Sequence, residues 1–463
     1  MLALIEIPRI EMARFVIARY EGNLMNAHRR QLVSLAHPVY LSLLASVASG
    51  IINTVWVSRL GGAAVAAVAV ATNTENVLLG FALVFASGTT VLIAHARGAR
   101  DPGALRAAVR GGWALCGLVT PLVVAGGLLL REPLARLVLG GGGSAALHLA
   151  TAYFAISLPG MTVFFAQQLV DGILKGAGDT RTPMRLALLA NGLILLCDPL
   201  LIHLYGVQGA AVSTVLCRCV ALVAGLRVLG RGALLRAAGQ ARPAEPVPAA
   251  LRRTLTTGLP MSADFTVRQA GALVLVAIVA RLGVPAVAGY AIAYKVMYVA
   301  TMAFYAVRQA AAIHTAHTRG TGKDARRDIG REAMLVSGAL GLSAAVLFAA
   351  TAPWIMAAFG AGPEVAHQGV LFLRCVGPYL LLMACFIALG GVFEGSGGAP
   401  ALLGVTLLGT AVQLPLAHAL SGLGLPGVCL ALALAMAVQC GAVAVLLRRA
   451  GRQEAEVSFA RVA

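Results

Sequence analysis

Long apolar stretches alternate with short polar connections along nearly the whole chain. Each stretch holds roughly 20 residues or more, the length that a helix needs to cross the ~30 Å hydrocarbon layer of a membrane. Segments of about ten residues with alternating polarity, typical of a membrane β-barrel, do not occur in this pattern. We therefore predict an all-α, polytopic membrane protein. The twelve predicted spans are 33–58, 63–94, 107–130, 145–170, 183–204, 207–229, 255–281, 285–316, 333–359, 368–392, 400–421 and 425–447.

Charge is distributed unevenly between the two sets of connections. The chain of 463 residues is 59% hydrophobic and carries a formal net charge of +18. The connections on the side of the two termini hold 27 lysines and arginines, and those on the opposite side hold 4. Because positive loops stay in the cytoplasm, we predict a protein of the cell (inner) membrane with both termini cytoplasmic. The basic charge thus indicates topology, and nucleic acid is not an expected partner.

The eight cysteines lie inside or beside the spans, without the spacing of a disulfide framework or a metal site. We expect neither a metal nor another cofactor.

The sequence contains an internal repeat, with one copy in each half of the chain. At an offset of 222 residues Pro38 falls on Pro260, RLG at 59–61 falls on RLG at 281–283, and HARG at 95–98 falls on HTRG at 317–320. Farther on, GILKGAG at 172–178 matches GVFEGSG at 391–397 at an offset of 219. Each copy holds six spans, so both enter the membrane in the same orientation around a pseudo-twofold axis along its normal. We interpret HARG and HTRG as helix ends, with the glycines in a left-handed stop.

The repeat predicts a division into five segments. The connector has several prolines and arginines and no apolar period. The first segment could form an interfacial helix before the first span. The predicted segments are 1–32 (N-terminal segment), 33–229 (N-terminal six-helix lobe), 230–253 (linker), 254–448 (C-terminal six-helix lobe) and 449–463 (tail).

Four phrases together are similar to one known family: SRLGGAAVAAVAVA, ARLGVPAVAGYAIA, DGILKGAGDTRTPM and CDPLLIHLYGVQGAAVST. Over roughly residues 30–448 the chain resembles the multidrug and toxic compound extrusion (MATE) family. The resemblance implies two six-helix lobes around a central cavity, with export driven by the entry of protons or sodium. It places Asp198 at a functional aspartate of the family, and Asn191 fits the same pattern. Three positions depart from it: Asn53 replaces an aspartate of many members, Ile194 replaces an asparagine, and Arg268 replaces a glutamate of sodium-coupled relatives.

Few ionisable side chains lie inside the spans, and each is a functional candidate because burial in a membrane is costly. Asn53, Glu75 and Asp198 come from three helices and should converge in the outer half of the N-terminal lobe. Burial disfavours the charged form of a carboxylic acid, which favours proton binding. We predict Asp198 as the main proton carrier, Glu75 as a second acid, and Asn53 and Asn191 as hydrogen-bond partners. Alternatively, Asp198 and Glu75 only bond to structural neighbours.

The C-terminal lobe carries the opposite charge at this depth, with Arg268, Lys295 and Arg374 but only Asp264 beside them. Asp264 and Arg268 lie four residues apart on one helical face, so a structural ion pair is one interpretation. One carboxylate cannot neutralise three cations, so the others must face water, lipid headgroups or an anionic substrate. The sharper hypothesis is that these four residues bind an anionic or zwitterionic substrate. Gln167 in the fourth span is a further candidate substrate contact.

These features predict a cation-gradient-driven antiporter, proton-coupled rather than sodium-coupled. It would export a small organic compound by alternating access and act as a monomer in the lipid bilayer. The substrate could be drug-like, including a cationic amphipathic compound, or an anionic or zwitterionic secondary metabolite. A flippase for a lipid-linked anionic pyrophosphate is the alternative. We do not expect an enzyme, because no cluster of His, Asp or Ser gathers near one surface.

Overall fold

The computed structural model describes the backbone of residues 6–139 and 144–462, and side chains from Ala27 to Leu447 apart from 134, 137–145, 233–235 and 238. Every regular element in this part is helical, which confirms the predicted class. The first half holds α1 (Glu6–Ser58), α2 (Gly62–Gly98), α3 (Pro102–Leu129), α4 (Arg131–Leu139), α5 (Ser144–Gly176) and α6 (Arg181–Arg231). After it come α7 (Ala233–Gln240), α8 (Val247–Ala280), α9 (Val284–Gly320), α10 (Arg326–Ala358), α11 (Pro363–Cys375), α12 (Gly377–Ser396), α13 (Ala399–Leu420), η1 (Ser421–Leu423) and α14 (Gly424–Val462).

Twelve membrane crossings follow from these helices. In the described residues, ten helical stretches are long and apolar enough to cross a membrane. Two of them, of 51 and 49 residues, are interrupted. Gly206 breaks α6 with a φ of 59°, and η1 with Gly424 separates α13 from α14. Each interrupted stretch therefore supplies two crossings, and the predicted number is reached.

The backbone repeats where the sequence repeats. Gly61 and Gly283 both have a φ of 100°, and Gly178 and Gly397 have φ values of 86° and 81°. These pairs lie 222 and 219 residues apart, the two offsets found in the sequence. Positive φ is a conformation that glycine adopts without steric penalty, so equivalent turns join equivalent helices in the two halves.

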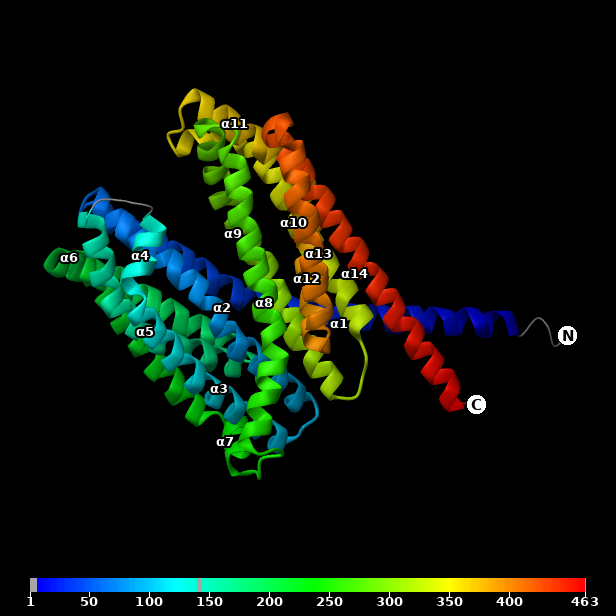
Figure 1. Cartoon of the computed structure of the whole chain (residues 1–463). Helices are drawn as coiled ribbons and strands as arrows, with labels where there is room; N and C mark the ends of the chain where they lie inside the picture. The colour runs from blue at the N-terminus through cyan, green and yellow to red at the C-terminus, as the bar shows by residue number, and fades with distance from the viewer. Residues whose placement is uncertain (1–5, 140–143, 463) are drawn as a thin grey trace.

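Two bundles diverge toward one end of the molecule (Figure 1). Helices α2–α6 form one bundle, which we call the N-terminal bundle, and α9–α14 form the C-terminal bundle. The first helix of each repeat links the two. Early in α1, Leu32 packs with Ile329 of α10, whereas Asn53 near its end bonds to α6. Early in α8, Ala250 lies against Gly111 of α3, whereas Gly271 near its end lies against Thr410 of α13.

The motifs HARG and HTRG meet each other where the bundles converge. A Cβ atom on Gly98 would lie 2.0 Å from the carbonyl oxygen of His317, and one on Gly320 would lie 2.1 Å from that of His95. Both glycines are helical, and the left-handed residues are Arg100 and Gly322. The predicted left-handed stop is therefore wrong at Gly98 and Gly320. Glycine is required there because the backbones of α2 and α9 touch.

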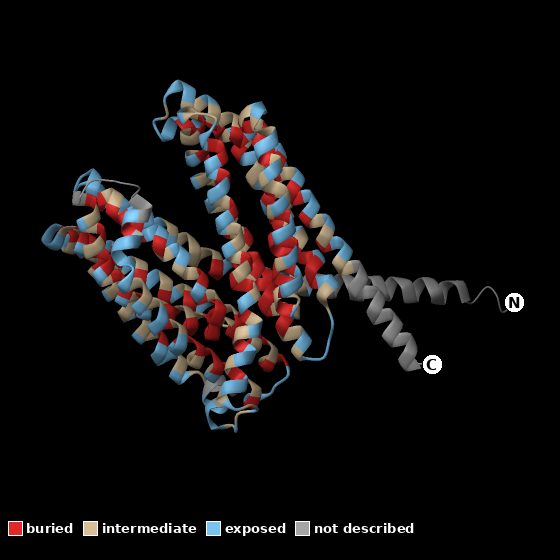
Figure 2. Ribbon diagram, viewed as in Figure 1, coloured by how far each residue is buried: buried red, intermediate tan, exposed pale blue. Residues whose placement is uncertain are grey.

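Two expectations about the polar segments change with the structure. α1 runs without interruption from Glu6 into the first span, so the N-terminal segment is continuous with it. The predicted linker contains the short helix α7. Large apolar side chains are exposed on several helices, among them Leu122, Leu129, Leu196, Leu273 and Trp354. Exposed positions recur along the helices of both bundles (Figure 2). A surface of this kind is stable against lipid rather than water.

Candidate functional site

A buried carboxyl group lies between α1 and α6 in the N-terminal bundle. Asp198 has no exposed surface, and Asn53 Nδ2 donates a 2.7 Å hydrogen bond to its Oδ2. The buried hydroxyl of Ser213 lies next to the same carboxyl group. Among the described residues, Asp198 Oδ1 has no hydrogen-bond partner with acceptable geometry. Asn53 thus holds one oxygen of the carboxyl group, and the Ser213 hydroxyl lies beside that group.

A second acid lies in the same bundle. Glu75 of α2 interacts electrostatically with Arg218 of α6 and lies beside Ser157 of α5. The buried Tyr153 interacts electrostatically with Glu75, Arg218 and Asp198. Asn53 and Asp198 are therefore in contact, whereas Glu75 lies beside Arg218 and Ser157.

The other two predicted polar residues of this bundle lie elsewhere. Asn191 Nδ2 is 3.5 Å from Ser46 Oγ, two helical turns from the Asn53–Asp198 bond along the same helix pair. Gln167 is buried in α5, and its Oε1 lacks a partner among the described residues. Neither side chain contacts Asp198.

The C-terminal bundle contains a buried ion-pair network. Arg268 Nη2 donates to Asp264 Oδ2, the expected i,i+4 pair of α8. Arg308 Nη2 of α9 lies 2.7 Å from the same oxygen and 2.7 Å from Glu394 Oε1 of α12. Thr406 of α13 donates to Asp264 Oδ1 at 2.5 Å. Two arginines and two carboxylates balance each other, so this network ties four helices together without net charge.

Sequence reasoning missed the central member of this network. Arg308 lies inside the predicted span 285–316, as Arg218 lies inside 207–229. A cation within an apolar span was the signal that could have found both residues. The predicted span 368–392 leaves Glu394 in the connection that follows, whereas α12 continues to Ser396.

Removing the central arginine should destabilise the protein strongly. Arg308→Met leaves Glu394 buried without its cation and Asp264 with only one. We expect a loss of about 3–5 kcal/mol of unfolding free energy, as for other broken buried pairs. The exposed pair Arg253–Glu245, with N···O 2.6 Å, provides the control, and Arg253→Met should change stability by about 0–1 kcal/mol. Thermal unfolding in detergent measures both variants, and equal midpoints would contradict a structural role for the network.

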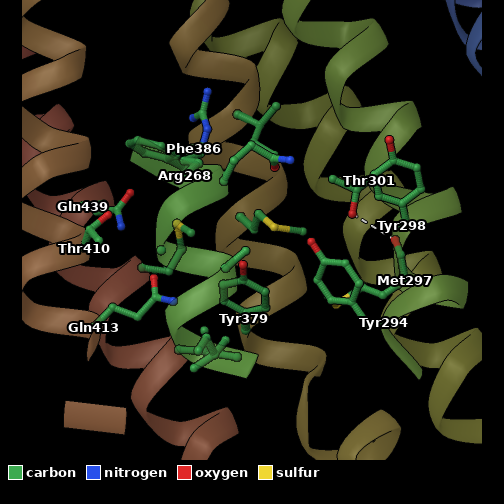
Figure 3. A pocket seen from close by; sticks show the side chains of 18 of the residues that line it. Arg268, Tyr294, Met297, Tyr298, Thr301, Tyr379, Phe386, Thr410, Gln413 and Gln439 are labelled. Atoms are coloured by element: carbon green, nitrogen blue, oxygen red, sulfur yellow. Dashed lines mark hydrogen bonds between the residues drawn. The ribbon is translucent and has the colours of Figure 1, made fainter. Parts of the chain in front are cut away.

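A cavity of about 130 Å³ opens beside this network, between α8, α9, α12, α13 and α14. Arg268 lies at one end, with tyrosine, methionine and glutamine side chains around the rest (Figure 3). The lining includes Tyr290, Tyr294, Met297, Tyr298, Thr301, Tyr305, Tyr379, Met383, Phe386, Thr410, Gln413 and Gln439.

The structure separates the predicted basic residues of this half. Only Arg268 lines the cavity, whereas Lys295 and Arg374 are exposed and do not contribute to its described lining. The predicted grouping of three cations around one site is therefore not present in this conformation.

Polar contacts also close the end where the bundles converge. Lys175 Nζ of α5 donates to Gln309 Oε1 of α9 at 3.2 Å and so links the two bundles. Farther from this end, Ser262 Oγ of α8 donates to the carbonyl of Gly80 in the middle of α2 at 2.6 Å. In the described residues, no group of three or more His, Cys, Asp or Glu side chains could hold a metal ion.

Comparison with known proteins gives the family. A sequence model of the MatE family matches residues 38–200 and 260–418, one match in each repeat. The probable multidrug resistance protein YpnP of Bacillus subtilis is 25% identical over 312 residues, covering 66% of this chain and 67% of that protein. The probable multidrug resistance protein NorM of Thermotoga maritima is 24% identical over 378 residues, 80% of either chain.

Solved structures share the fold. An outward-facing multidrug resistance MATE transporter of the MOP superfamily superposes with a TM-score of 0.84 at 21% identity, covering 91% of this chain and 95% of that one. A MOP superfamily transporter from Pyrococcus furiosus, described as having a binding pocket of reverse polarity, gives 0.83 at 21% identity with the same coverage. The matches to both repeats, the twelve crossings and the two-bundle fold agree, and the chain belongs to the MatE family of multidrug and toxic compound extrusion transporters.

Proposed function

We propose that this MATE-family exporter is driven by protons and that Asp198 carries the coupling proton. The family assignment identifies a multidrug or toxic compound exporter, not an enzyme. The observation that carries the proton proposal is the fully buried Asp198, whose Oδ2 is held by Asn53 and whose Oδ1 is unpaired among the described residues. Desolvation favours the neutral form of such an acid until a conformational change exposes it to water.

Alternating access supplies that change. The bundles converge at Gly98 and Gly320 and diverge at the other end (Figure 1). The excess of lysine and arginine supports placing the converging end and both termini on the cytoplasmic side. In this orientation the structure is open to the outside. A proton that reaches Asp198 from the outside neutralises the carboxylate and favours closure of the outer end, and its release to the cytoplasm resets the carrier.

The two lobes proposed for this motion are residues 33–229 and 254–448, acting as a monomer. Glu75, beside Arg218, is proposed as a second acid. Sodium coupling at Asp264 is disfavoured because Arg268 and Arg308 both pair with this carboxylate.

Transport in everted membrane vesicles tests the coupling ion. With ethidium and benzoate tested separately, an imposed proton gradient should drive uptake of at least one of the two compounds into the vesicles, and a protonophore should abolish it. Replacement of sodium by choline should leave the rate unchanged. Uptake that requires a sodium gradient and survives the protonophore would overturn the proposal.

A further inference from the structure

The described lining of the tyrosine-rich cavity in the C-terminal bundle lacks the carboxylates that would favour an organic cation. Among its 22 described lining residues there is one charged side chain, Arg268, and neither an aspartate nor a glutamate. A cation in this space would face the guanidinium group without a carboxylate on the cavity wall to balance it. The wall therefore favours an anionic or neutral group.

Arg268, at the cationic end of the cavity, has N–H donors that are not hydrogen-bonded within the described part of the chain. Arg268 uses Nη2 for Asp264, whereas its Nε and Nη1 have no partner among the described residues. Nε–H and Nη1–H point to opposite sides of the guanidinium group, so only a pair of donors that includes Nη2 can bind the two oxygens of one carboxylate. Arg268 offers such a pair to a ligand when it turns from Asp264 toward the cavity, and its buried donors, which the described residues leave unpaired in this conformation, then find a partner.

Arg268 can engage a ligand without leaving its present partner unpaired. Asp264 also accepts hydrogen bonds from Arg308 at 2.7 Å and from Thr406 at 2.5 Å. If Arg268 turns toward the cavity, the Asp264 carboxylate keeps one cation and one hydroxyl group. The neighbouring ion-pair network thus positions Arg268 and tolerates its movement.

The remaining wall suits an aromatic ring. The lining includes five tyrosines, Tyr290, Tyr294, Tyr298, Tyr305 and Tyr379. Figure 3 shows three of them, Tyr294, Tyr298 and Tyr379, around the space. A dry cavity of about 150 Å³ accommodates benzene, and this cavity measures about 130 Å³. It thus holds about one ring, whereas sites that enclose a drug-sized molecule measure roughly 300–1,000 Å³.

From the single cation, its unpaired donors and the ring-sized tyrosine cavity, we infer that the C-terminal bundle binds the aromatic carboxylate group of an exported compound. The carboxylate lies on Arg268 and the ring lies among the tyrosines. This assignment rests on the proposed export function, since it names the class of compound that the exporter carries.

Equilibrium binding to the purified full-length protein in detergent tests the inference without any ion gradient. Benzoate, benzamide and benzylamine present nearly the same ring with a negative, a neutral and a positive group at neutral pH. We expect benzoate to bind at least tenfold more tightly than either of the other two, as measured by isothermal titration calorimetry. Tighter binding of benzylamine, or no saturable binding of benzoate in the millimolar range, would overturn the assignment.

Variants at two positions of the same helix locate the effect. Arg268→Gln should remove the preference for benzoate over benzamide, and Arg268→Lys should restore part of it by keeping the cation. Arg281→Gln, at the exposed end of α8 and outside the described cavity lining, should bind all three probes as the wild type does. A preference for benzoate that persists in Arg268→Gln would contradict the role of this arginine. Unfolding midpoints measured without ligand identify a variant that is merely misfolded.

The failure of this inference and that of proton coupling are distinguishable. If benzoate does not bind but a proton gradient still drives ethidium export, only the substrate assignment is wrong. If benzoate binds as expected but export ignores the proton gradient, only the coupling proposal is wrong.

Discussion

Asp198→Asn should reduce proton-driven export at least tenfold while the protein still folds and binds its substrate. The amide has nearly the shape of the carboxyl group, and its oxygen can still accept the hydrogen bond from Asn53 Nδ2. The amide cannot bind or release a proton. The side chain at position 198 therefore no longer changes its charge when the transporter changes between the outward-open and the inward-open state. Initial rates of ethidium uptake into everted vesicles under an imposed proton gradient, normalised to the amount of protein, measure the loss.

Asp328→Asn is the matched control for this change, because Asp328 is exposed in the first turn of α10. It should transport at the wild-type rate. Thermal unfolding should give similar midpoints for both variants and the wild type. Export by Asp198→Asn at the wild-type rate would exclude Asp198 as the obligatory carrier and leave Glu75 as the other proposed acid.

Gly320→Ala should destabilise the converged end of the two bundles. Its new methyl group would lie 2.1 Å from the carbonyl oxygen of His95 and 2.8 Å from the backbone nitrogen of Ala99. Backbone atoms cannot turn aside as a flexible side chain can, so α2 and α9 must separate. Overpacking of this kind costs about 1–3 kcal/mol, which outweighs the gain of roughly 0.5–1 kcal/mol for replacing a helical glycine by alanine. We expect a lower unfolding midpoint in detergent.

Gly404→Ala separates these two effects. Gly404 lies inside α13 with no atom within 4 Å of its would-be Cβ, so only the helix-propensity gain applies. Its midpoint should equal or exceed that of the wild type. If Gly320→Ala were as stable as Gly404→Ala, the close contact between HARG and HTRG would not contribute to the stability of this conformation.

The acid site of the N-terminal bundle was largely predictable from the sequence, and the network of the C-terminal bundle was not. Asn53 and Asp198 stand out because polar residues are rare in apolar spans, and two parallel helices bring them into contact. Lys295 and Arg374 stand out for the same reason, yet both are exposed. Hydropathy reveals that a helix carries a charge, but the rotation of the helix against its neighbours decides whether that charge faces protein, water or lipid.

The sequence by itself determined the all-helical membrane class, the twelve crossings and the twofold repeat. Span length and repeat offset can be read directly from the sequence. Lipid offers no hydrogen-bond partners, and a helix pairs its backbone N–H and C=O groups within one segment. Only the tertiary structure decided that Arg308 joins Asp264 to Glu394, that Arg268 borders a ring-sized cavity, and that HARG meets HTRG. These contacts join helices separated by many residues, and they depend on how closely the helix backbones approach one another.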